Sequence, residues 1–239
     1  MYFDEKSLYS PYTFSHYSTM LSIVSTPIGN LEDITLRAMR VLREADYIAC
    51  EDTRVTWQLL GYYDIANNGR LMSFHSHSGF SKTDKIIELL KEGKHVALVS
   101  DAGTPGISDP GFVLIRQAVE EGIEVVPVPG ASAVLSALVA SGIDCHQYLY
   151  LGFLPVKKWR QTMLKSLVNK QYTVVVYESV HRIEKTLSEL EEYLGSDFHI
   201  VVGREITKKF EEFKRGTISE VRDYYKWEWK VKGEFVLVF

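Results

Sequence analysis

The sequence predicts an α/β protein of two domains, with a mostly parallel sheet in the first domain and a mixed sheet in the second. Through residue 141, short apolar runs alternate with helical patterns, which is typical of βαβ units. After residue 142, strands become more frequent and their spacing resembles that of hairpins, which favours a mixed sheet. We therefore expect an N-terminal domain over residues 21–142 and a C-terminal domain over residues 148–239.

Each expected strand of the N-terminal domain is a short run rich in apolar residues that stops at Gly, Pro or polar residues. These runs cover residues 21–25, 47–50, 71–74, 96–99 and 125–128. Apolar residues at helical spacing predict a helix after each run, the first over residues 34–44 with Asp33 as its N-cap. A capping box over residues 81–84 opens the third helix, the fourth begins at Phe112, and the fifth ends near Gly142.

In the C-terminal domain, apolar or alternating stretches predict further strands over residues 148–153, 173–177, 200–205, 208–215 and 235–239. Helical spacing predicts helices over residues 181–194 and 217–225. A basic amphipathic segment follows the first of these strands and contains Lys157, Lys158, Trp159, Arg160 and Lys165.

The composition is that of an ordinary globular protein, with 46% hydrophobic and 24% charged residues. The net charge of −4 argues against wholesale coating of nucleic acid, but the charge is unevenly distributed. Residues 1–149 carry 11 Lys and Arg against 18 Asp and Glu, whereas residues 150–239 carry 16 against 13. The basic C-terminal third is therefore compatible with a polyanionic partner.

Cysteine usage and apolar runs bear on the compartment of the protein. Cys50 and Cys145 lie far apart without metal-ligand spacing, and we interpret both as small buried residues in a reducing compartment. No apolar run approaches the roughly 18 residues that indicate a membrane span. The first 20 residues lack the basic start and apolar centre of a signal peptide, so we expect a disordered or artefactual extension on a cytoplasmic protein.

Five turns that follow strands are built of small or polar residues, and together they indicate a ligand site. The longest covers residues 100–111, and the others cover residues 26–30, 51–54, 75–79 and 129–133. Because the carboxyl ends of parallel strands lie at one edge of a sheet, we expect these turns to converge on one crevice. The chain lacks G-x-G-x-x-G after its first strand and G-x-x-x-x-G-K-[ST] anywhere, which disfavours NAD enzymes and P-loop ATPases.

Long motifs occur in order along residues 21–239. They are Thr26-Pro-Ile-Gly-Asn-Leu-Glu-Asp-Ile-Thr35, Cys50-Glu-Asp-Thr-Arg54, Ser100-Asp-Ala-Gly-Thr-Pro-Gly-Ile-Ser-Asp-Pro-Gly111, Pro127-Val-Pro-Gly130, Gly152-Phe-Leu-Pro155, Tyr177-Glu-Ser179, Arg204-Glu-Ile-Thr-Lys208 and Lys232-Gly-Glu-Phe-Val236. This ordered set resembles the ribosomal RNA small-subunit methyltransferase I family. The resemblance implies the two-domain fold of tetrapyrrole methylases, with S-adenosylmethionine in a cleft between the domains. It also implies 2′-O-methylation of a cytidine in 16S ribosomal RNA of the 30S subunit, and a homodimer.

Residue by residue, the resemblance implies a cofactor site with walls from both domains. The residues it implies are Pro27, Ile28, Gly29, Ser100, Asp101, Ala102, Gly103, Thr104, Ser132, Ala133, Tyr177 and Glu178. The chain departs from the family pattern at Ser76, Ser78 and Ala131, where Glu, Asn and Pro are common. The first two departures bear on any RNA contact of their turn and leave the cofactor assignment in place.

Methyl transfer to a ribose hydroxyl needs an aligned oxygen, and a general base can add roughly 10²–10⁴-fold in rate. The candidate bases are His75, His77, Glu51, Glu205 and Lys208, and the sequence prefers none of them. For the two histidines a solvent-facing polar turn is the alternative interpretation. For Glu51 the alternative is a structural pairing with Arg54.

RNA is bound through phosphate contacts and base stacking at single-stranded places. The candidate RNA contacts are Arg54, Lys157, Lys158, Arg160, Arg182 and Arg204. Trp159 adds an aromatic face to this set, although an exposed helix face with a half-buried Trp is the structural alternative.

Two other functions remain open at this point. One is a methyltransferase of the same fold that acts on a tetrapyrrole or a modified protein side chain. The other is a non-catalytic module that binds RNA or a nucleotide. The basic C-terminal third and the motif over residues 50–54 argue against the first alternative.

Overall fold

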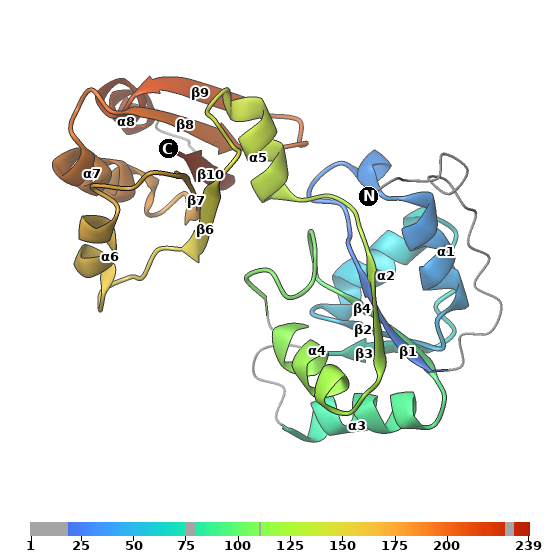
Figure 1. The fold of residues 1–239 in the computed structure, drawn as a ribbon. Coiled ribbons are helices and arrows are strands. Elements are labelled where there is room, and N and C mark those ends of the chain that lie inside the picture. The colour runs from blue at the N-terminus through green and yellow to red at the C-terminus, as the bar shows by residue number, and fades with distance from the viewer. Residues whose placement is uncertain (1–18, 75–79, 110, 228–231) are drawn as a thin grey trace, which may run out of the picture.

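Two five-stranded sheets organise the computed structural model, which describes residues 19–74, 80–109, 111–227 and 232–239 (Figure 1). The first sheet has the order β3-β2-β4-β1-β5, and all its neighbouring strands are parallel. The second has the order β6-β7-β10-β8-β9, and only β6 and β7 are parallel. The predicted fold class, a parallel sheet followed by a mixed sheet, is confirmed.

The first sheet and its helices form the lower lobe in Figure 1. The elements are β1 (Met20–Val24), the 3-10 helix η1 (Leu31–Asp33), α1 (Leu36–Glu44), β2 (Tyr47–Cys50), α2 (Thr53–Tyr62), β3 (Leu71–Ser73), α3 (Phe80–Lys91), β4 (His95–Val99), α4 (Gly111–Glu120) and β5 (Glu124–Val128). Helices α1 and α2 cover one face of the sheet, and α3 and α4 cover the other. Strand β4 is buried along its whole length, which explains why it is a continuous apolar run.

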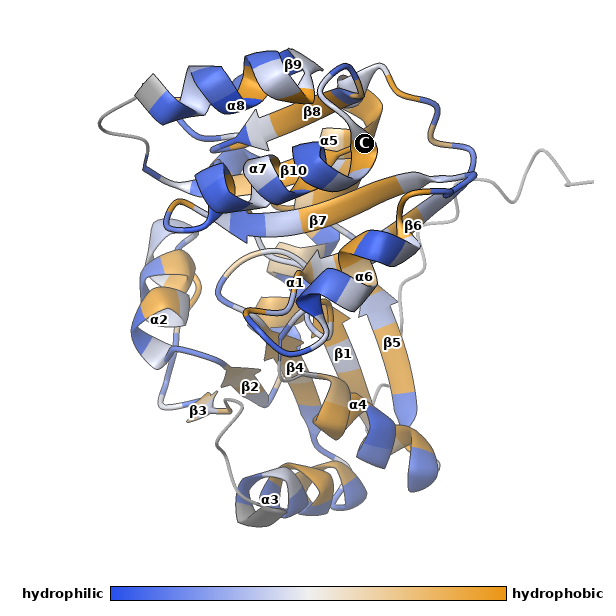
Figure 2. Cartoon of the chain, turned by 90° about the vertical axis from the view of Figure 1, so that its left-hand side faces the viewer, coloured by the Kyte–Doolittle hydropathy of each residue, from blue (hydrophilic) through white to orange (hydrophobic). Residues whose placement is uncertain are grey.

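The second sheet lies in the upper lobe and is also covered on both faces. Its elements are β6 (Tyr148–Phe153), α6 (Arg160–Ser166), β7 (Thr173–Ser179), α7 (Ile183–Leu194), β8 (His199–Arg204), β9 (Glu212–Thr217), α8 (Ile218–Trp227) and β10 (Glu234–Val238). Helices α6, α7 and α8 pack on one face. Figure 2 shows β7 apolar over most of its length and hydrophilic at its end, where Glu178 and Ser179 lie.

Helix α5 (Ala133–Ser141) packs on the other face of the second sheet. Its buried residues Val134, Ala137 and Leu138 contact strand residues such as Val175 and Val236. The unbroken alternation of strand and helix up to this point predicts that the helix belongs to the N-terminal domain. Alternation of strand and helix along the sequence does not show which sheet buries the apolar face of a helix. In the structure, α5 packs on the sheet of the second lobe.

Several element boundaries differ from the predicted ones. Helix α1 begins at Leu36 and not at residue 34, because the Thr35 side chain accepts a hydrogen bond from Ala38 N, whereas Asp33 lies in η1. Helix α3 begins at Phe80, so residue 81 is already helical and the predicted capping box does not open the helix. Helix α4 begins one residue early, at Gly111.

The two cysteines lie in different environments. Cys50 is buried at the end of β2, and burial raises the pKa of its thiol to about 11. Cys145 is exposed in the connection between α5 and β6, so the prediction that it is buried was wrong. Within the described part of the chain, no helix is long and apolar enough to cross a membrane. The predicted N-terminal extension falls almost entirely on residues 1–18, which lie outside the described residues.

We expect Leu138→Ala to lower the free energy of unfolding by about 2–5 kcal/mol, because Leu138 is buried between α5 and the second sheet. Val139 is the matched control, since it is 77% exposed on the same helix. Val139→Ala should change the stability by less than about 0.5 kcal/mol. Urea unfolding followed by circular dichroism measures both, and equal effects would contradict the packing of α5 on this sheet.

Candidate functional site

A cavity of about 840 Å³ lies between the two lobes, and four of the five predicted turns line it. These are the turns over residues 26–30, 51–54, 100–111 and 129–133. The opposite wall is formed by residues 177–181 at the end of β7 and residues 233–236 at the start of β10. The convergence expected from the parallel sheet therefore occurs, and the second sheet closes the crevice. The fifth turn, over residues 75–79 with His75 and His77, lies outside the described residues.

The turns after β1 and β4 are joined by a short backbone bridge. Thr26 N donates to Gly103 O at 2.9 Å, and Gly103 N donates to Thr26 O at 3.1 Å. The side chains add to this bridge, because Thr26 Oγ1 donates to Ser100 O at 3.1 Å and Ser25 Oγ lies 2.8 Å from Thr104 Oγ1. The two turns therefore form one connected floor under the cavity.

The turn after β5 reaches this floor only because residue 130 is glycine. A Cβ atom at Gly130 would lie 2.8 Å from Ser25 Cβ, which is closer than real Cβ contacts come. Ser132, two residues on, caps α5 by accepting a hydrogen bond from Leu135 N at 3.4 Å. Ser132 and Ala133, two of the predicted cofactor residues, both line the cavity.

The predicted cofactor residues after β4 divide into two groups. Ser100, Ala102, Gly103 and Thr104 line the cavity. The Asp101 side chain instead accepts a hydrogen bond from Asp52 N at 3.0 Å, and thereby joins the turn after β4 to the turn after β2. The contact expected between Asp101 and the cofactor stays a prediction.

The turn after β2 combines a cavity-lining residue with an exposed ion pair. Glu51 lines the cavity, and Asp52 caps α2 by accepting a hydrogen bond from Arg54 N at 2.8 Å. The Arg54 guanidinium also pairs with Asp52 at 2.6 Å, and these hydrogen bonds lower the pKa of Asp52 to about 2. The Arg54 side chain is 86% exposed and is held by Asp52.

On the second lobe, Tyr177 and Glu178 point in opposite directions from β7. The Tyr177 ring packs edge-to-face against Tyr150 at 5.3 Å, and burial raises the pKa of its phenol. The Glu178 carboxylate is completely buried, where it accepts from Arg182 Nε at 2.7 Å and from Thr186 Oγ1 at 2.6 Å. Because this carboxylate is fully engaged, any contact of Glu178 with a ligand has to come from its main chain.

Among the described residues, direct contacts cross from the first lobe to the second beside the cavity. The Ile28 side chain packs against the apolar cluster around α5. A Cβ atom at Gly29 would lie 2.4 Å from Lys208 Cγ, so the glycine lets the Lys208 stem lie across the turn. On another side of the cavity, Ser108 Oγ lies 2.6 Å from Tyr150 Oη.

The candidate bases Glu205 and Lys208 are paired with each other. Lys208 Nζ lies 3.0 Å from Glu205 Oε1 and 3.1 Å from Glu234 Oε2. Burial opposes both charges, but the ion pairs outweigh it: they raise the pKa of Lys208 and, with the hydrogen bond from Glu234 N, lower the pKa of Glu205. Lys208 therefore keeps its proton more firmly than a free lysine.

The residues predicted to contact RNA differ in their exposure to solvent. Lys157 and Lys158 are exposed in the connection between β6 and α6. Arg160 is only 4% exposed and pairs with Glu189, so its predicted contact with RNA does not fit the structure. Arg182 is mostly buried against Glu178, and Arg204 Nε donates to Lys232 O at 3.0 Å.

Sequence reasoning missed several residues of the second wall. Ile206, Gly233 and Glu234 line the cavity although they were not predicted site residues. The motif over residues 232–236 contained a signal, because a Gly directly before a strand often marks a close approach. Indeed, a Cβ atom at Gly233 would lie 2.3 Å from Glu205 Oε1.

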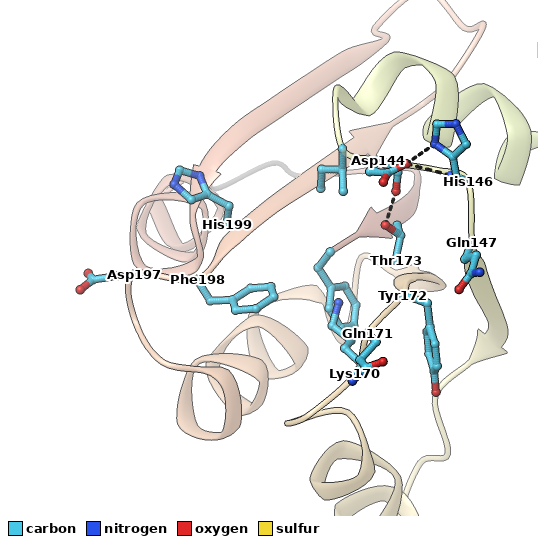
Figure 3. Close-up of a pocket in the computed structure, with 12 residues that line it drawn as sticks. Asp144, His146, Gln147, Lys170, Gln171, Tyr172, Thr173, Asp197, Phe198 and His199 are labelled. Carbon is cyan, nitrogen blue, oxygen red and sulfur yellow. Dashed lines mark hydrogen bonds and ion pairs between the residues drawn. The ribbon is translucent and has the colours of Figure 1, made fainter.

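A second cavity of about 860 Å³ lies at the other end of the second sheet (Figure 3). Lys170 sits in it, over the rings of Phe198 at 5.2 Å and Phe239 at 4.6 Å, and burial lowers the pKa of its amine to about 8. None of the four predicted turns that the structure describes lines this cavity, so we assign the functional site to the cavity between the lobes. In the described residues, no group of three or more His, Cys, Asp or Glu is placed to hold a metal ion.

Comparisons with known proteins agree in family and fold. A family model described as Tetrapyrrole (Corrin/Porphyrin) Methylases matches residues 20–222. Proteins named ribosomal RNA small subunit methyltransferase I are similar over nine tenths of this chain. The one from Bacillus subtilis is 50% identical over 220 residues, which are 92% of this chain and 74% of that protein. The one from Halalkalibacterium halodurans is 47% identical over 219 residues, which are 91% and 74%.

Solved structures share the fold at low sequence identity. A structure of diphthine synthase covers 92% of this chain and 90% of its own, with a TM-score of 0.71 and 13% identity. Uroporphyrin-III C-methyl transferase from Thermus thermophilus, complexed with S-adenyl homocysteine, covers 91% and 96%, with a TM-score of 0.63 and 18% identity.

We expect Gly130→Ala to displace the turn after β5 from the floor of the cavity and to weaken S-adenosylmethionine binding at least tenfold. Gly61→Ala is the control, because nothing lies within 4 Å of a Cβ atom at Gly61 in α2. Alanine in a helix interior should leave affinity unchanged and raise the stability by up to about 1 kcal/mol. Isothermal titration calorimetry measures the affinities, and equal values for both variants would refute this role of Gly130.

Proposed function

The chain belongs to the tetrapyrrole (corrin/porphyrin) methylases and, within them, to the ribosomal RNA small-subunit methyltransferase I family, and on this premise we propose that it methylates a cytidine 2′-hydroxyl in 16S ribosomal RNA with S-adenosylmethionine. The cavity between the lobes carries the proposal, because it is large enough for a cofactor and is walled by both sheets. The relatives that match at 44–50% identity do so over more than nine tenths of the chain, which is more than either lobe alone. The enzymes for tetrapyrroles and diphthine match at only 13–19% identity, which supports the fold alone.

The described residues fit S-adenosylmethionine. A cavity of about 840 Å³ falls within the usual range of roughly 300–1,000 Å³ for ligand pockets. Gly103 and Gly130 keep Cβ atoms out of its floor, so that a ligand can approach the main chain closely there. In this proposal Ser100, Ala102, Thr104 and Ser132 hold the cofactor from the first lobe, and Tyr177 holds it from the second.

S-adenosylmethionine supplies a methyl group that is already activated on its sulfonium. The protein has to align the ribose oxygen with that methyl group and exclude water, and such positioning lowers a barrier by roughly 7–11 kcal/mol. Ile28 lines the cavity and the next residue, Gly29, lies against Lys208 of the second lobe, so we assign Pro27, Ile28 and Gly29 to the part of the cavity where the two substrates meet.

The ion pairs of Lys208 and Glu205 limit which candidate base can accept a proton from the ribose hydroxyl. Lys208 holds its proton between Glu205 and Glu234, so we assign it to the binding of a phosphate and not to proton removal. Glu205 is occupied by Lys208 and by Glu234 N. Glu51 lines the cavity from the first lobe and stays a candidate base, together with His75 and His77.

Exposed cations at the rim serve as the RNA contacts in this proposal. Arg54 lies on the first lobe, and Lys157 and Lys158 lie on the second. A ribosomal substrate implies a cytoplasmic enzyme that acts on the 30S subunit. The homodimer implied by the family resemblance is part of the proposal and is measured by analytical ultracentrifugation.

The test is methylation of 30S subunits from a bacterial strain that lacks the modification. After incubation with labelled S-adenosylmethionine, the RNA is digested to nucleosides and separated. Label should appear in 2′-O-methylcytidine. Label in another nucleoside, in protein or in an added tetrapyrrole would contradict the proposal, and equal RNA binding with and without cofactor in the absence of turnover would indicate a binding module.

The double variant Lys157→Ala/Lys158→Ala should bind RNA more weakly and with a smaller salt dependence. Each lost phosphate contact reduces the slope of log affinity against log salt concentration by roughly one. The matched control is Lys91→Ala/Arg116→Ala, which removes two exposed cations from α3 and α4 that are paired with Glu121 and Glu120. Filter binding at several salt concentrations measures the slopes. Equal slopes for the two double variants would show that Lys157 and Lys158 do not contact RNA phosphates.

A further inference from the structure

Trp159 has an unfavourable conformation and an exposed side chain. Its indole is 65% exposed, and its backbone lies in the left-handed region with φ at +68°. Residues other than glycine rarely adopt this conformation, and an exposed Trp gains little from burial. The surrounding structure therefore has to hold Trp159 in place.

A buried arginine anchors the chain directly after Trp159. Arg160 Nε donates to Glu189 Oε2 at 2.7 Å, and Arg160 Nη2 donates to Thr186 Oγ1 at 2.7 Å. Arg160 Nη1 turns back to the main chain and donates to Pro155 O at 3.1 Å. One guanidinium thus ties both ends of the stretch over residues 156–159 to α7.

A second arginine supports the same stretch from the cavity side. Arg182 Nη1 donates to Leu154 O at 3.0 Å, while Arg182 Nε pairs with the buried Glu178 carboxylate. Glu178 also accepts from Thr186, which in turn accepts from Arg160. The two arginines, the glutamate and the threonine form one network, and it grips the consecutive carbonyls of residues 154 and 155.

The network holds the stretch over residues 156–159 close to the end of the second sheet that lines the cavity. Strands β6 and β7 are parallel, so residues 153–159 leave the sheet at the edge where residues 177–181 line the cavity (Figure 1). Phe153 itself lines the cavity and packs on Tyr177 at 5.6 Å. Trp159 thus follows a wall residue of the site by six positions along the chain.

The chemistry of the stretch is that of a binding surface for single-stranded nucleic acid. Lys157 and Lys158 are exposed, and Lys158 Nζ lies 5.5 Å from the centre of the Trp159 ring. Aromatic rings beside cations bind unpaired bases by stacking while the cations contact phosphates. The target ribose has to enter the cavity to receive the methyl group, and a strand that is locally unpaired there leaves the bases next to the target available for stacking.

We propose that Trp159 is a stacking platform for an unpaired base adjacent to the methylated nucleotide, and that Arg160 is the positioning residue that holds it there. This inference rests on the proposed function and assigns to it a residue for RNA recognition. It also explains why Arg160 is buried in a run of otherwise exposed basic residues.

The first test compares Trp159→Ala, Trp159→Gly and Trp159→Phe in methylation of unmodified 30S subunits. Loss of one stacking contact should raise KM for the subunit about 5- to 100-fold in the Ala and Gly variants, with kcat and cofactor affinity near those of the unmodified chain. Phe should restore most of the loss. Gly relieves the strained backbone, so it keeps the test valid if the Ala variant is unstable. Tyr62→Ala removes an aromatic ring of similar exposure from the end of α2 and should change nothing.

A second readout does not depend on activity. Titration with a short unstructured RNA oligonucleotide should quench tryptophan fluorescence, and Trp159→Phe should bind with similar affinity but lose much of the quenching. The positioning role of Arg160 predicts that Arg160→Gln, or Thr186→Val where the former does not fold, raises KM without adding to the effect of Trp159→Ala.

The outcomes separate the two proposals. Unchanged KM and undiminished quenching in the Trp159 variants, in an enzyme that still methylates RNA, would overturn the stacking role alone. Additive effects of Arg160 and Trp159 would overturn the positioning role. Absence of RNA methylation by the unmodified chain would overturn the proposed function, and the fluorescence titration would then decide whether Trp159 binds RNA.

Discussion

The paired hydrogen bonds between the main chains of Thr26 and Gly103 are the constraint on which the site depends. Parallel strands end at one edge of a sheet, but nothing in that arrangement makes their connections touch. Here the turns after β1 and β4 bond to each other like a short piece of antiparallel sheet, and Ser25, Thr104 and Gly130 pack against that bridge. The polar groups of the two turns satisfy one another, and these bonds hold the turns together as one floor.

The two lobes meet through a glycine that leaves room for a lysine side chain and through an apolar side chain that packs in the second lobe. Gly29 admits the Lys208 stem, and Ile28 joins the apolar cluster under α5. Helix α5 itself follows a strand of the first sheet and packs on the second, so the turn over residues 129–133 both lines the cavity and carries the chain across. A change in the angle between the lobes would therefore alter the walls of the site directly, which couples its shape to the packing of α5.

Burial decides what the charged residues near the site can do. Lys157, Lys158 and Arg160 are neighbours in sequence, but only the lysines reach solvent, whereas Arg160 bonds to Glu189, Thr186 and a carbonyl. Lys208 and Glu205 are both candidates by residue type, but their ion pair keeps Lys208 protonated and makes Glu205 a weaker base than it would be alone. An unpaired charge in either place would be costly, so the networks serve stability as well as function.

The sequence by itself determined the order of the strands along the chain, the parallel and mixed character of the two sheets, and the turns that line the cavity. These depend on local patterns, namely apolar runs, helical spacing and small residues after strands. Such patterns can be recognised in a single sequence. Only the tertiary structure decided that α5 belongs to the second sheet, that Cys145 is exposed, that Arg160 is buried and that residues 233–236 complete the second wall. Each of these depends on which surfaces meet across long stretches of chain, and the free energy of such contacts is not encoded in the spacing of neighbouring residues.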